Sequence, residues 1–411
     1  MLKEFGVVMS RLAGIHINSN KKNTLVYETE IEFPTFVRIP LGKCSPTVSI
    51  GDKVKIGQII GECEKKFTPP VHASVSGTVK GIDHYVEIAS DGKNEKISIG
   101  RIEITNRESL AKAAYNCGLV GLGGAGFPTH IKLQPKSTVD TLIINGAECE
   151  PYIISDRCVM TQKAREISEG ADIIAGVLGI TRKIIGIEKN SAVCAEKLSQ
   201  YGLEVKILGD KYPKGAEKVI IYECTGRVVE EKKLPSDCGV IVLNAATVAK
   251  LAEYAKTGIP LVSRYVTFAG PLISDSVCFN LPIGTPVSYV LDKLKVKAQH
   301  IIDGGVMMGK EVGEDAVVTK TTGAILAFDE LTYPKETSCI RCGRCYGVCP
   351  VMLSPAAIDR AYHKRDVKLL KNLKVNICME CGCCEYVCPA KRRLTEFNRR
   401  GKIMLKESEN A

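Results

Sequence analysis

The sequence predicts a multidomain α/β protein that ends in a small helical, cysteine-rich domain. Three observations support this prediction: the chain length, a cysteine spacing that occurs twice near the C-terminus, and alternating helical and strand patterns in the middle. A chain of 411 residues is too long for one ordinary hydrophobic core. We therefore expect four domains, which span residues 1–103, 104–260, 261–330 and 331–411.

Eight of the 18 cysteines form two compact runs with the same spacing, Cys-x2-Cys-x2-Cys-x3-Cys-Pro. In two-cluster ferredoxins, three thiolates of such a run hold one [4Fe–4S] cluster and the fourth reaches the other cluster. Zinc sites also use four thiolates, but they usually combine two distant pairs. The runs therefore predict two clusters, one held by Cys339, Cys342, Cys345 and Cys388 and the other by Cys378, Cys381, Cys384 and Cys349.

The segment between the runs, Ser354–Val375, is rich in Leu, Ala, Lys and Arg at helical spacing, so we expect a helical connector. Cys383 is additional to the repeated spacing and is interpreted as a bystander. Two adjacent clusters conduct single electrons, so this part of the chain predicts an electron carrier.

Residues 108–260 alternate between helical and strand patterns, which predicts an α/β sandwich with parallel strands. The β-rich runs are Val139–Asn145, Lys183–Glu188, Leu203–Leu208 and Gly239–Leu243, and amphipathic stretches include Thr161–Gly179 and Ser191–Tyr201.

A glycine-rich segment precedes the first of these strands, with Gly121, Gly123, Gly124 and Gly126 close together. Because Ser109–Asn116 has a helical pattern, the segment does not follow a strand, and an ordinary dinucleotide fingerprint is not expected. Closely spaced glycines nevertheless expose backbone N–H groups and let a phosphate or a flat ring approach. An α/β scaffold that has lost its cofactor is the alternative.

Three segments carry a family resemblance: GLVGLGGAGFPTHIKL (118–133), INGAECEP (144–151) and YPKGAEK (212–218). They resemble the C subunit of the Rnf electron-transport complex and, more distantly, the flavoprotein subunit of respiratory complex I. The resemblance continues through TGRVV (225–229), VTFAGPL (266–272) and the cluster runs, and covers nearly the whole chain after about residue 35.

The resemblance implies an NADH-dependent oxidoreductase subunit that binds FMN and NAD(H). By position, Gly121, Gly123, Gly124, Gly126 and Lys132 would cradle FMN, Asn145 would bond its ring, and Asn244 and Thr247 match a later flavin contact. Glu148, Glu150, Glu217 and Tyr212 would line the flavin and nicotinamide region, with Glu150 and Glu217 positioning NADH. Leu122 and Ala147 replace an arginine and an aspartate of the complex I pattern, so the fine details of NADH binding are left open.

The flanking segments predict two β-rich domains. Residues 45–82 resemble a barrel-sandwich hybrid of the biotinyl/lipoyl type, but the hairpin tip, Cys63–Phe67, lacks the usual pattern around a modified lysine. We therefore expect a structural version of that barrel. Residues 262–330 combine strand alternation, Gly-Pro turns and a short helix (Val287–Leu294), which predicts a β-grasp domain of the SLBB type. Met307 and Met308 are predicted to pack in its core.

Charge and hydropathy constrain the partners. The net charge is +10, and part of the excess lies at the chain end, in Lys391, Arg392, Arg393, Arg399, Arg400 and Lys402. No nucleic-acid module accompanies it, so we expect a solvated tail or an acidic redox partner.

Met1–Ser10 has no secretory-signal pattern, and the longest apolar stretch, around Ile173–Ile180, is too short to span a bilayer. We expect a cytoplasmic protein that reaches the membrane only through partner subunits.

The combined prediction is an electron-transfer subunit that links NADH, FMN and two [4Fe–4S] clusters in a ferredoxin:NAD⁺ oxidoreductase complex of the ion-translocating Rnf type. FMN is needed because NADH delivers two electrons at once, whereas each cluster takes one. Two alternatives stay open. One is a soluble subunit that supplies a dedicated reductase, such as methylenetetrahydrofolate, proline or corrinoid reductase; the other is a flavin-free relay adaptor.

Overall fold

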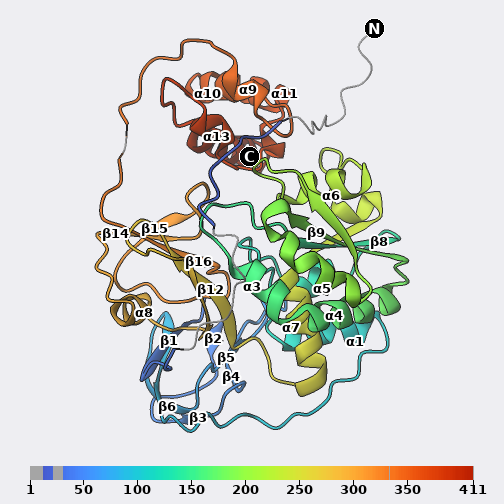
Figure 1. The fold of residues 1–411 in the computed structure, drawn as a ribbon, viewed down its shortest axis with the longest axis vertical. Helices are drawn as coiled ribbons and strands as arrows, with labels where there is room; N and C mark the ends of the chain where they lie inside the picture. Colours follow the sequence, from blue (N-terminus) through green and yellow to red (C-terminus); the bar gives the residue numbers. More distant parts are fainter. Residues whose placement is uncertain (1–12, 22–30, 333, 411) are drawn as a thin grey trace.

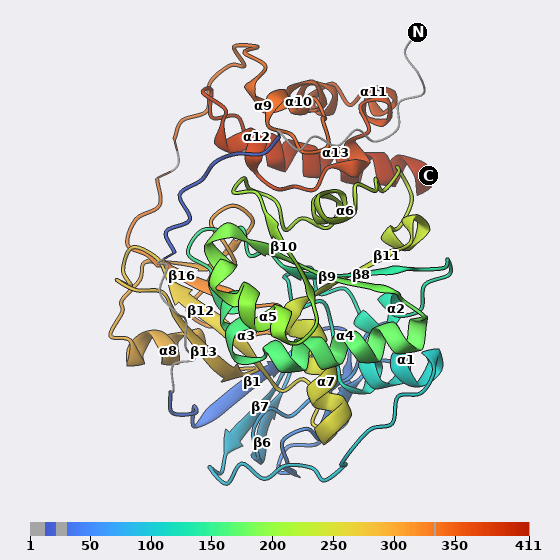
Figure 2. The same ribbon diagram turned by 45° about the vertical axis from the view of Figure 1, so that its right-hand side comes forward.

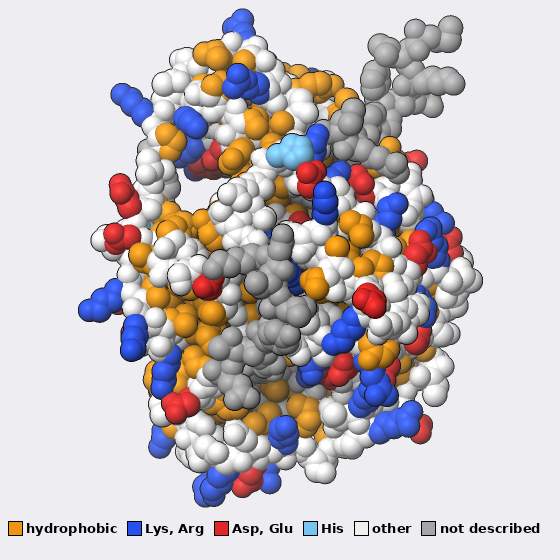
Figure 3. All heavy atoms as spheres, in the orientation of Figure 1, with side chains coloured by type: hydrophobic (Ala, Val, Ile, Leu, Met, Phe, Trp, Pro, Cys, Tyr) orange, Lys and Arg blue, Asp and Glu red, His pale blue; other side chains and the backbone are white. Residues whose placement is uncertain are grey.

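The computed structural model describes residues 13–21, 31–332 and 334–410, so the predicted absence of a signal in Met1–Ser10 lies outside the described residues. The N-terminal β-rich part, the α/β part and a third, mixed sheet form the body of the molecule (Figure 1). The cysteine-rich helical part stands above this body as a separate lobe. Acidic and basic side chains are interspersed over the face in Figure 3.

The N-terminal part is a pair of small antiparallel sheets. One has the order β1–β7–β6–β3 (Phe36–Pro40, Tyr85–Ser90, Gly77–Ile82 and Lys53–Val54), and the other has the order β2–β4–β5 (Ser45–Pro46, Ile59–Glu62 and Val71–His72). Alternate residues such as Val37 and Ile39 point into the shared core. His72 is also buried, as a packed strand residue.

The α/β part contains the predicted parallel sheet, in the order β10–β9–β8–β11. These strands are Glu204–Leu208, Arg182–Glu188, Thr141–Gly146 and Val240–Asn244. One face packs on α6 (Glu217–Thr225), and the opposite face packs on α4 (Ala164–Leu178) and α7 (Ala245–Thr257), as Figure 2 shows. The remaining helices are α1 (Arg107–Asn116), α2 (Thr129–Lys132), α3 (Ser155–Gln162) and α5 (Ala195–Gln200).

The third part is a five-stranded mixed sheet in the order β13–β12–β16–β14–β15. Its strands are Val277–Pro282, Ser263–Ala269, Ala324–Phe328, His300–Asp303 and Lys310–Val312, and α8 (Val287–Lys293) packs on it. A parallel central pair, β12 and β16, flanked by antiparallel neighbours matches the predicted β-grasp arrangement. The core prediction is wrong for Met308, which is 54% exposed.

One side chain joins these three parts. Lys320, which precedes β16, donates hydrogen bonds from Nζ to the carbonyl oxygens of Pro70 and Gly118, each at 2.9 Å. Burial lowers the pKa of this amine to about 8. The contact ties the β-grasp part to both the barrel and the segment before the glycine-rich loop.

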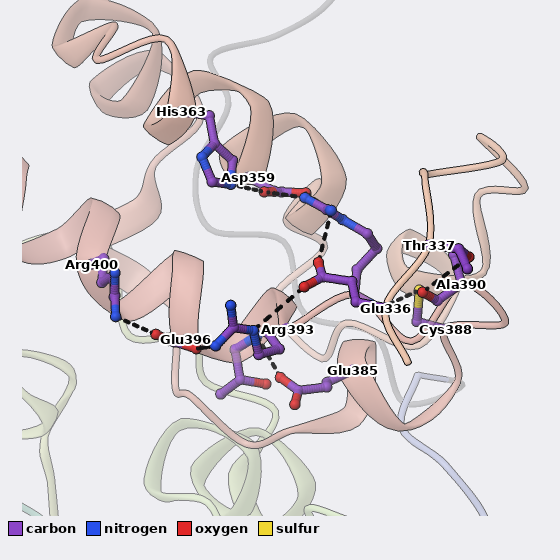
Figure 4. A network of polar contacts seen from close by, with 12 residues as sticks. Glu336, Thr337, Asp359, His363, Glu385, Cys388, Ala390, Arg393, Glu396 and Arg400 are labelled. Carbon is purple, nitrogen blue, oxygen red and sulfur yellow. Dashed lines mark hydrogen bonds and ion pairs between the residues drawn. The ribbon is translucent and has the colours of Figure 1, made fainter. Parts of the chain in front are cut away.

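The helical lobe contains α9 (Arg344–Gly347), α10 (Pro355–His363), α11 (Val367–Asn372), α12 (Cys383–Tyr386) and α13 (Leu394–Asn410). The predicted connector is therefore two helices, separated where Arg365 adopts a φ of 53°. Ion pairs hold the lobe together (Figure 4): Arg393 contacts Glu336, and Arg400 contacts Glu396. Arg392, Arg399 and Lys402 are also paired within the chain, so most of the predicted basic tail is neutralised internally.

No helix within residues 13–21, 31–332 and 334–410 is both long and apolar enough to cross a membrane.

Candidate flavin and iron–sulfur site

The glycine-rich loop is fastened at its ends and open in its middle. The N–H of Gly121 donates to the carbonyl of Phe127 at 2.8 Å, and the N–H of Leu122 donates to the Thr247 hydroxyl at 3.0 Å. Gly124 has a φ of +105°, and a Cβ added there would meet no atom within 4 Å. The loop therefore presents an uncovered backbone, which is the cradle that a phosphate or flat ring requires.

Two asparagines end neighbouring parallel strands beside this loop. Asn145 of β8 and Asn244 of β11 are register partners. The Asn145 side chain donates to the carbonyl of Gly215 at 2.8 Å, while Asn244 caps α7 by accepting from the N–H of Ala246 at 2.9 Å. Side chains at the carboxyl ends of parallel strands lie where α/β sheets bind ligands. The two asparagines thus hold the loops around the predicted flavin position.

Two half-buried carboxylates, Glu148 and Asp156, lie next to Asn244. The carboxylate of Glu148 accepts from the Ser155 hydroxyl at 2.7 Å and from the N–H of Asp156 at 2.9 Å, so it caps α3. Asn244 donates to Asp156 at 2.8 Å. Burial, followed by the charge of Glu148, raises the pKa of Asp156 to about 7. Glu148 therefore positions α3 in addition to its predicted place near the flavin.

Arg264 is a site residue that sequence reasoning missed. It lies on β12, is 7% exposed, and donates from Nη2 to the carbonyl of Leu122 at 3.0 Å. Burial lowers the pKa of its guanidinium to about 10, and the nearby charge of Asp156 opposes that shift. Because Arg264 belongs to another domain, the local strand pattern gave no sign that it supports the glycine-rich loop.

Lys132 and Glu217, two of the predicted site residues, form an ion pair with each other. The Lys132 Nζ lies 2.5 Å from the Glu217 carboxylate and 3.3 Å from the carbonyl of Val242. Glu217 is the first residue of α6, where a carboxylate is stabilised by the helix dipole. This pair lies on the α6 side of the sheet.

Glu150 lies at a different junction. Its carboxylate accepts from the N–H of Met307 at 3.0 Å and from the Tyr212 hydroxyl at 3.5 Å. Burial raises the pKa of Glu150 above its ordinary value. The carbonyl of Tyr212 accepts from the Cys383 thiol at 3.7 Å, so Glu150 and Tyr212 stand between the α/β part and the second cysteine run.

A cleft of about 590 Å³ opens at the carboxyl ends of β8, β9 and β10, and Tyr212 is the predicted site residue that lines it. Lys21, Arg157 and Glu188 also line this cleft, and sequence reasoning missed all three. The Lys21 ammonium lies 3.2 Å from Glu188 and also contacts the carbonyl of Glu148. Lys21 precedes every motif in the chain, and no sequence pattern could place it here.

Four of the predicted ligands surround one cavity in the helical lobe: Cys349, Cys378, Cys381 and Cys384. Backbone N–H groups point at two of these sulfurs, from Leu353 to Cys349 at 3.3 Å and from Glu380 to Cys378 at 3.4 Å. Four thiols around one cavity, with amide donors to the sulfurs, are the donor set that a cubane cluster needs. They include Cys349 of the first run, as the predicted crossover requires.

The other predicted set is more open. Cys339 and Cys342 are exposed, whereas Cys345 packs against a small apolar cluster that includes the buried Cys388. The Cys388 sulfur accepts from the N–H of Arg392 at 3.5 Å. In the part of the chain that the structure describes, no three His, Cys, Asp or Glu side chains converge closely enough to hold a single metal ion.

A glycine-rich cradle on a parallel α/β sheet, joined to a lobe with two four-cysteine sets, defines a flavin- and iron–sulfur-dependent electron-transfer protein. Residues 114–253 match the Nuo51 FMN-binding domain, residues 10–102 the RnfC barrel-sandwich hybrid domain and residues 332–389 the 4Fe-4S dicluster domain. The chain belongs to the family of the C subunits of Rnf-type ion-translocating oxidoreductase complexes. These matches confirm the predicted types of the three matched domains and their FMN and iron–sulfur cofactors.

Three relatives, each the C subunit of its complex, show how far the likeness extends. The chain is 38% identical to that of the Na(+)-translocating ferredoxin:NAD(+) oxidoreductase complex of Acetobacterium woodii, over 86% of this chain and 87% of the relative. It is 35% identical to the C subunit of the proton-translocating ferredoxin:NAD(+) oxidoreductase complex of Clostridium ljungdahlii, over 87% of this chain and 84% of the relative. It is 33% identical to the C subunit of the ion-translocating oxidoreductase complex of Rhodobacter capsulatus, over 86% of this chain and 75% of the relative.

Proposed function

We propose that this chain transfers electrons between NAD(H) and one-electron carriers, through FMN and two [4Fe–4S] clusters, as part of an ion-translocating ferredoxin:NAD⁺ oxidoreductase complex. The relatives that match almost end to end carry that activity in their names. Ferredoxin and the other subunits of the complex are the proposed partners. The chain would sit at the cytoplasmic face of the membrane through those subunits.

The observation that carries this proposal is the contact between Glu150, Tyr212 and Cys383. Glu150 is a predicted nicotinamide-positioning residue, and the hydroxyl of Tyr212 donates to it at 3.5 Å. The carbonyl of the same tyrosine accepts from Cys383, which lines the same cavity as the four cysteines of the second set. We propose that these contacts form a short route between the nicotinamide region and the cluster held by the second set of cysteines.

The chain's own residues have separable tasks in this proposal. The glycine-rich loop, which is open at Gly124, and the Lys132 ammonium would hold the FMN phosphate and ring, because amide N–H groups and a cation favour an anion. Bound FMN supplies the conversion between the two-electron hydride and single electrons. Glu150 and Glu217 would orient the nicotinamide, and the cysteines would carry the clusters.

The test uses anaerobically purified chain loaded with FMN and iron. We expect NADH to reduce a one-electron acceptor such as ferricyanide, and the rate to depend on the flavin content. A protein that binds no FMN when FMN is in excess would instead support the relay-adaptor alternative. Affinity purification from the native host then identifies the complex. Membrane subunits in the eluate support the proposal, whereas a soluble terminal reductase supports the other alternative.

A further inference from the structure

Two cysteines outside the cluster runs face each other across the strand pair that supports the hairpin tip of the barrel. In the pairing of β2 with β4, Ser45 lies opposite Glu62 and Pro46 opposite Gly61. The next pair outward is Cys44 and Cys63. The N–H of Thr47 donates to the carbonyl of Ile60 at 3.0 Å, so Thr47 and Ile60 are a hydrogen-bonded pair.

Hydrogen-bonded and non-hydrogen-bonded pairs alternate along an antiparallel ladder. Thr47 and Ile60 are a hydrogen-bonded pair, so the third pair from them, Cys44 and Cys63, is a non-hydrogen-bonded pair. The N–H of Cys44 accordingly bonds to the carbonyl of Leu41 and not to Cys63. In such pairs the Cα atoms are about 4.5 Å apart and the side chains lie close together. That spacing is within the range of roughly 4.4 to 6.8 Å that a disulfide tolerates.

The electrostatic surroundings of Cys44 agree with this pairing, because Cys63 is among the groups that shift its pKa. Burial, then a hydrogen bond with the Cys63 thiol and its charge, raises the pKa of Cys44 to about 12. The Lys320 ammonium acts on Cys44 in the opposite direction. Cys44 is buried, whereas Cys63 is half-buried and therefore within reach of a small molecule. The pair has an accessible thiol and a shielded one.

We propose that Cys44 and Cys63 form a reversible disulfide by exchange with a low-molecular-weight disulfide. The Cys63 thiolate attacks one sulfur of the small disulfide RSSR, the S–S bond breaks, and one RS⁻ leaves and takes up a proton. Cys44 then loses its proton and attacks the Cys63 sulfur, which expels the second RS⁻. In total, two protein thiols are oxidised and one RSSR is reduced to two RSH.

The first step also removes one of the influences that keep Cys44 protonated, although burial, the largest of them, remains. Once Cys63 is part of a mixed disulfide, it is no longer a titrating thiol, so its upward effect on the pKa of Cys44 disappears. The neighbouring Lys320 ammonium remains and stabilises the Cys44 thiolate. The more exposed cysteine thus reacts first, and the shielded one resolves the intermediate.

The location connects this pair with the flavin loop. The hairpin tip that follows Cys63 packs the ring of Phe67 edge-on against Phe127 of the glycine-rich segment, with 6.2 Å between centroids. The carbonyl of Lys66 also hydrogen-bonds the His130 ring at 3.0 Å. Because the disulfide fixes the base of this tip, we expect the oxidised protein to release FMN several times more slowly than the reduced protein.

The test treats cluster- and FMN-loaded protein anaerobically with glutathione disulfide, blocks the remaining thiols and maps the peptides by mass spectrometry. The expected result is a peptide pair linked through Cys44 and Cys63 that disappears after dithiothreitol. Cys44→Ser should instead trap glutathione on Cys63, and Cys63→Ser should abolish the reaction. Cys238→Ser is the matched control, since that half-buried thiol has Arg227, Asp237 and Asp140 as its charged neighbours.

Two results would overturn the proposal. If both Cys44 and Cys63 are still recovered as blocked free thiols at every ratio of glutathione disulfide to glutathione, while the wild-type protein keeps its iron and flavin, the pair is not a disulfide site. If the linked peptide forms but FMN fluorescence reports equal release rates before and after oxidation, the connection to the flavin loop is wrong. Neither result depends on NADH oxidation, so failure of the proposed function would be recognised separately.

Discussion

The hydroxyl of Thr247 accepts a hydrogen bond from the backbone N–H of Leu122 at 3.0 Å. Through this bond the first turn of α7 fixes a loop that lies 125 residues earlier in the chain. Thr247 is fully buried, so no water can replace the hydroxyl if it is lost. The open shape of the glycine-rich loop therefore depends on a side chain outside the loop.

Thr247→Val should weaken FMN binding. Valine has nearly the same shape but leaves the Leu122 N–H without its acceptor, at a cost of about 1–3 kcal/mol. If that cost falls on the flavin-binding form of the loop, affinity drops by at least about fivefold. FMN titration followed by fluorescence quenching measures the change. Thr257→Val, at the exposed end of the same helix, should bind FMN normally; equal losses in both variants would refute the prediction.

Gly124→Val should abolish FMN binding and leave the clusters assembled. The φ of +105° is strained for a β-branched residue, and the added side chain would fill the space above the open backbone. The flavin content after purification and the iron content report the two effects separately. Gly202→Val introduces comparable strain at a φ of +82°, also into open space. If the Gly202 variant loses flavin equally, general destabilisation is the cause.

Cys378→Ala should remove one cluster and leave the other. The wild-type chain should hold about eight iron atoms and eight acid-labile sulfides, and the variant about four of each. Reduced-state EPR should lose one cubane signal. Cys383→Ala is the matched control within the same run, because Cys383 is predicted to be no ligand, and it should keep all eight irons. Zinc in place of iron after anaerobic reconstitution would contradict the assignment.

Stability should depend on pH through Asp156. Its pKa is raised from an ordinary 3.8 to about 7, chiefly by burial, so the folded protein binds a proton that the unfolded chain has already released. This contribution is fully present below about pH 4 and is lost as the pH rises to about 7. The thermal unfolding temperature should fall between pH 5 and pH 8, and this fall should be smaller in Asp156→Asn. Asp172→Asn, at an exposed helix position, should retain the wild-type slope.

Glu150→Ala and Glu217→Ala should slow NADH oxidation in protein with a full flavin complement. A loss of about 1 Å in nicotinamide placement can cost on the order of 10²-fold in rate. Glu150→Gln keeps the shape and part of the hydrogen bonding to Met307, so it should be less impaired than the alanine variant. Reduction of an artificial acceptor gives kcat and KM for each variant. Wild-type values in both alanine variants would remove these residues from the nicotinamide site.

The elements that the sequence predicted well are those with a local signal. The strand at β9, predicted at Lys183–Glu188, differs from the observed Arg182–Glu188 by one residue, because its β-branched run has clear ends. The cysteine runs predicted the set around Cys378 through spacing alone. The helix predicted at Ser191–Tyr201 begins instead as a 3-10 turn over Lys189–Cys194, since helix ends carry weaker signals than helix centres.

The supporting residues of the site could not be predicted, because their partners are distant in sequence. Arg264 is the one charged residue of β12, and its bond to Leu122 depends on how two domains dock. Lys21 is likewise an ordinary lysine until the fold brings it to Glu188. Glu148 was expected near the flavin from family resemblance, but its role as the cap of α3 follows only from the three-dimensional arrangement.

The hydrogen bonds of the Lys320 amine limit how domains of this chain can be exchanged with those of a relative. Its two acceptors are main-chain carbonyls, of Pro70 and Gly118, so they are set by the path of the backbone and not by residue type. A Cβ added to Gly118 would lie 3.0 Å from this amine and 2.9 Å from His72, which leaves little room for a different path. A chimera that takes only one of the three body domains from a relative would have to reproduce this junction. The barrel, flavin and β-grasp segments are therefore best exchanged as one block.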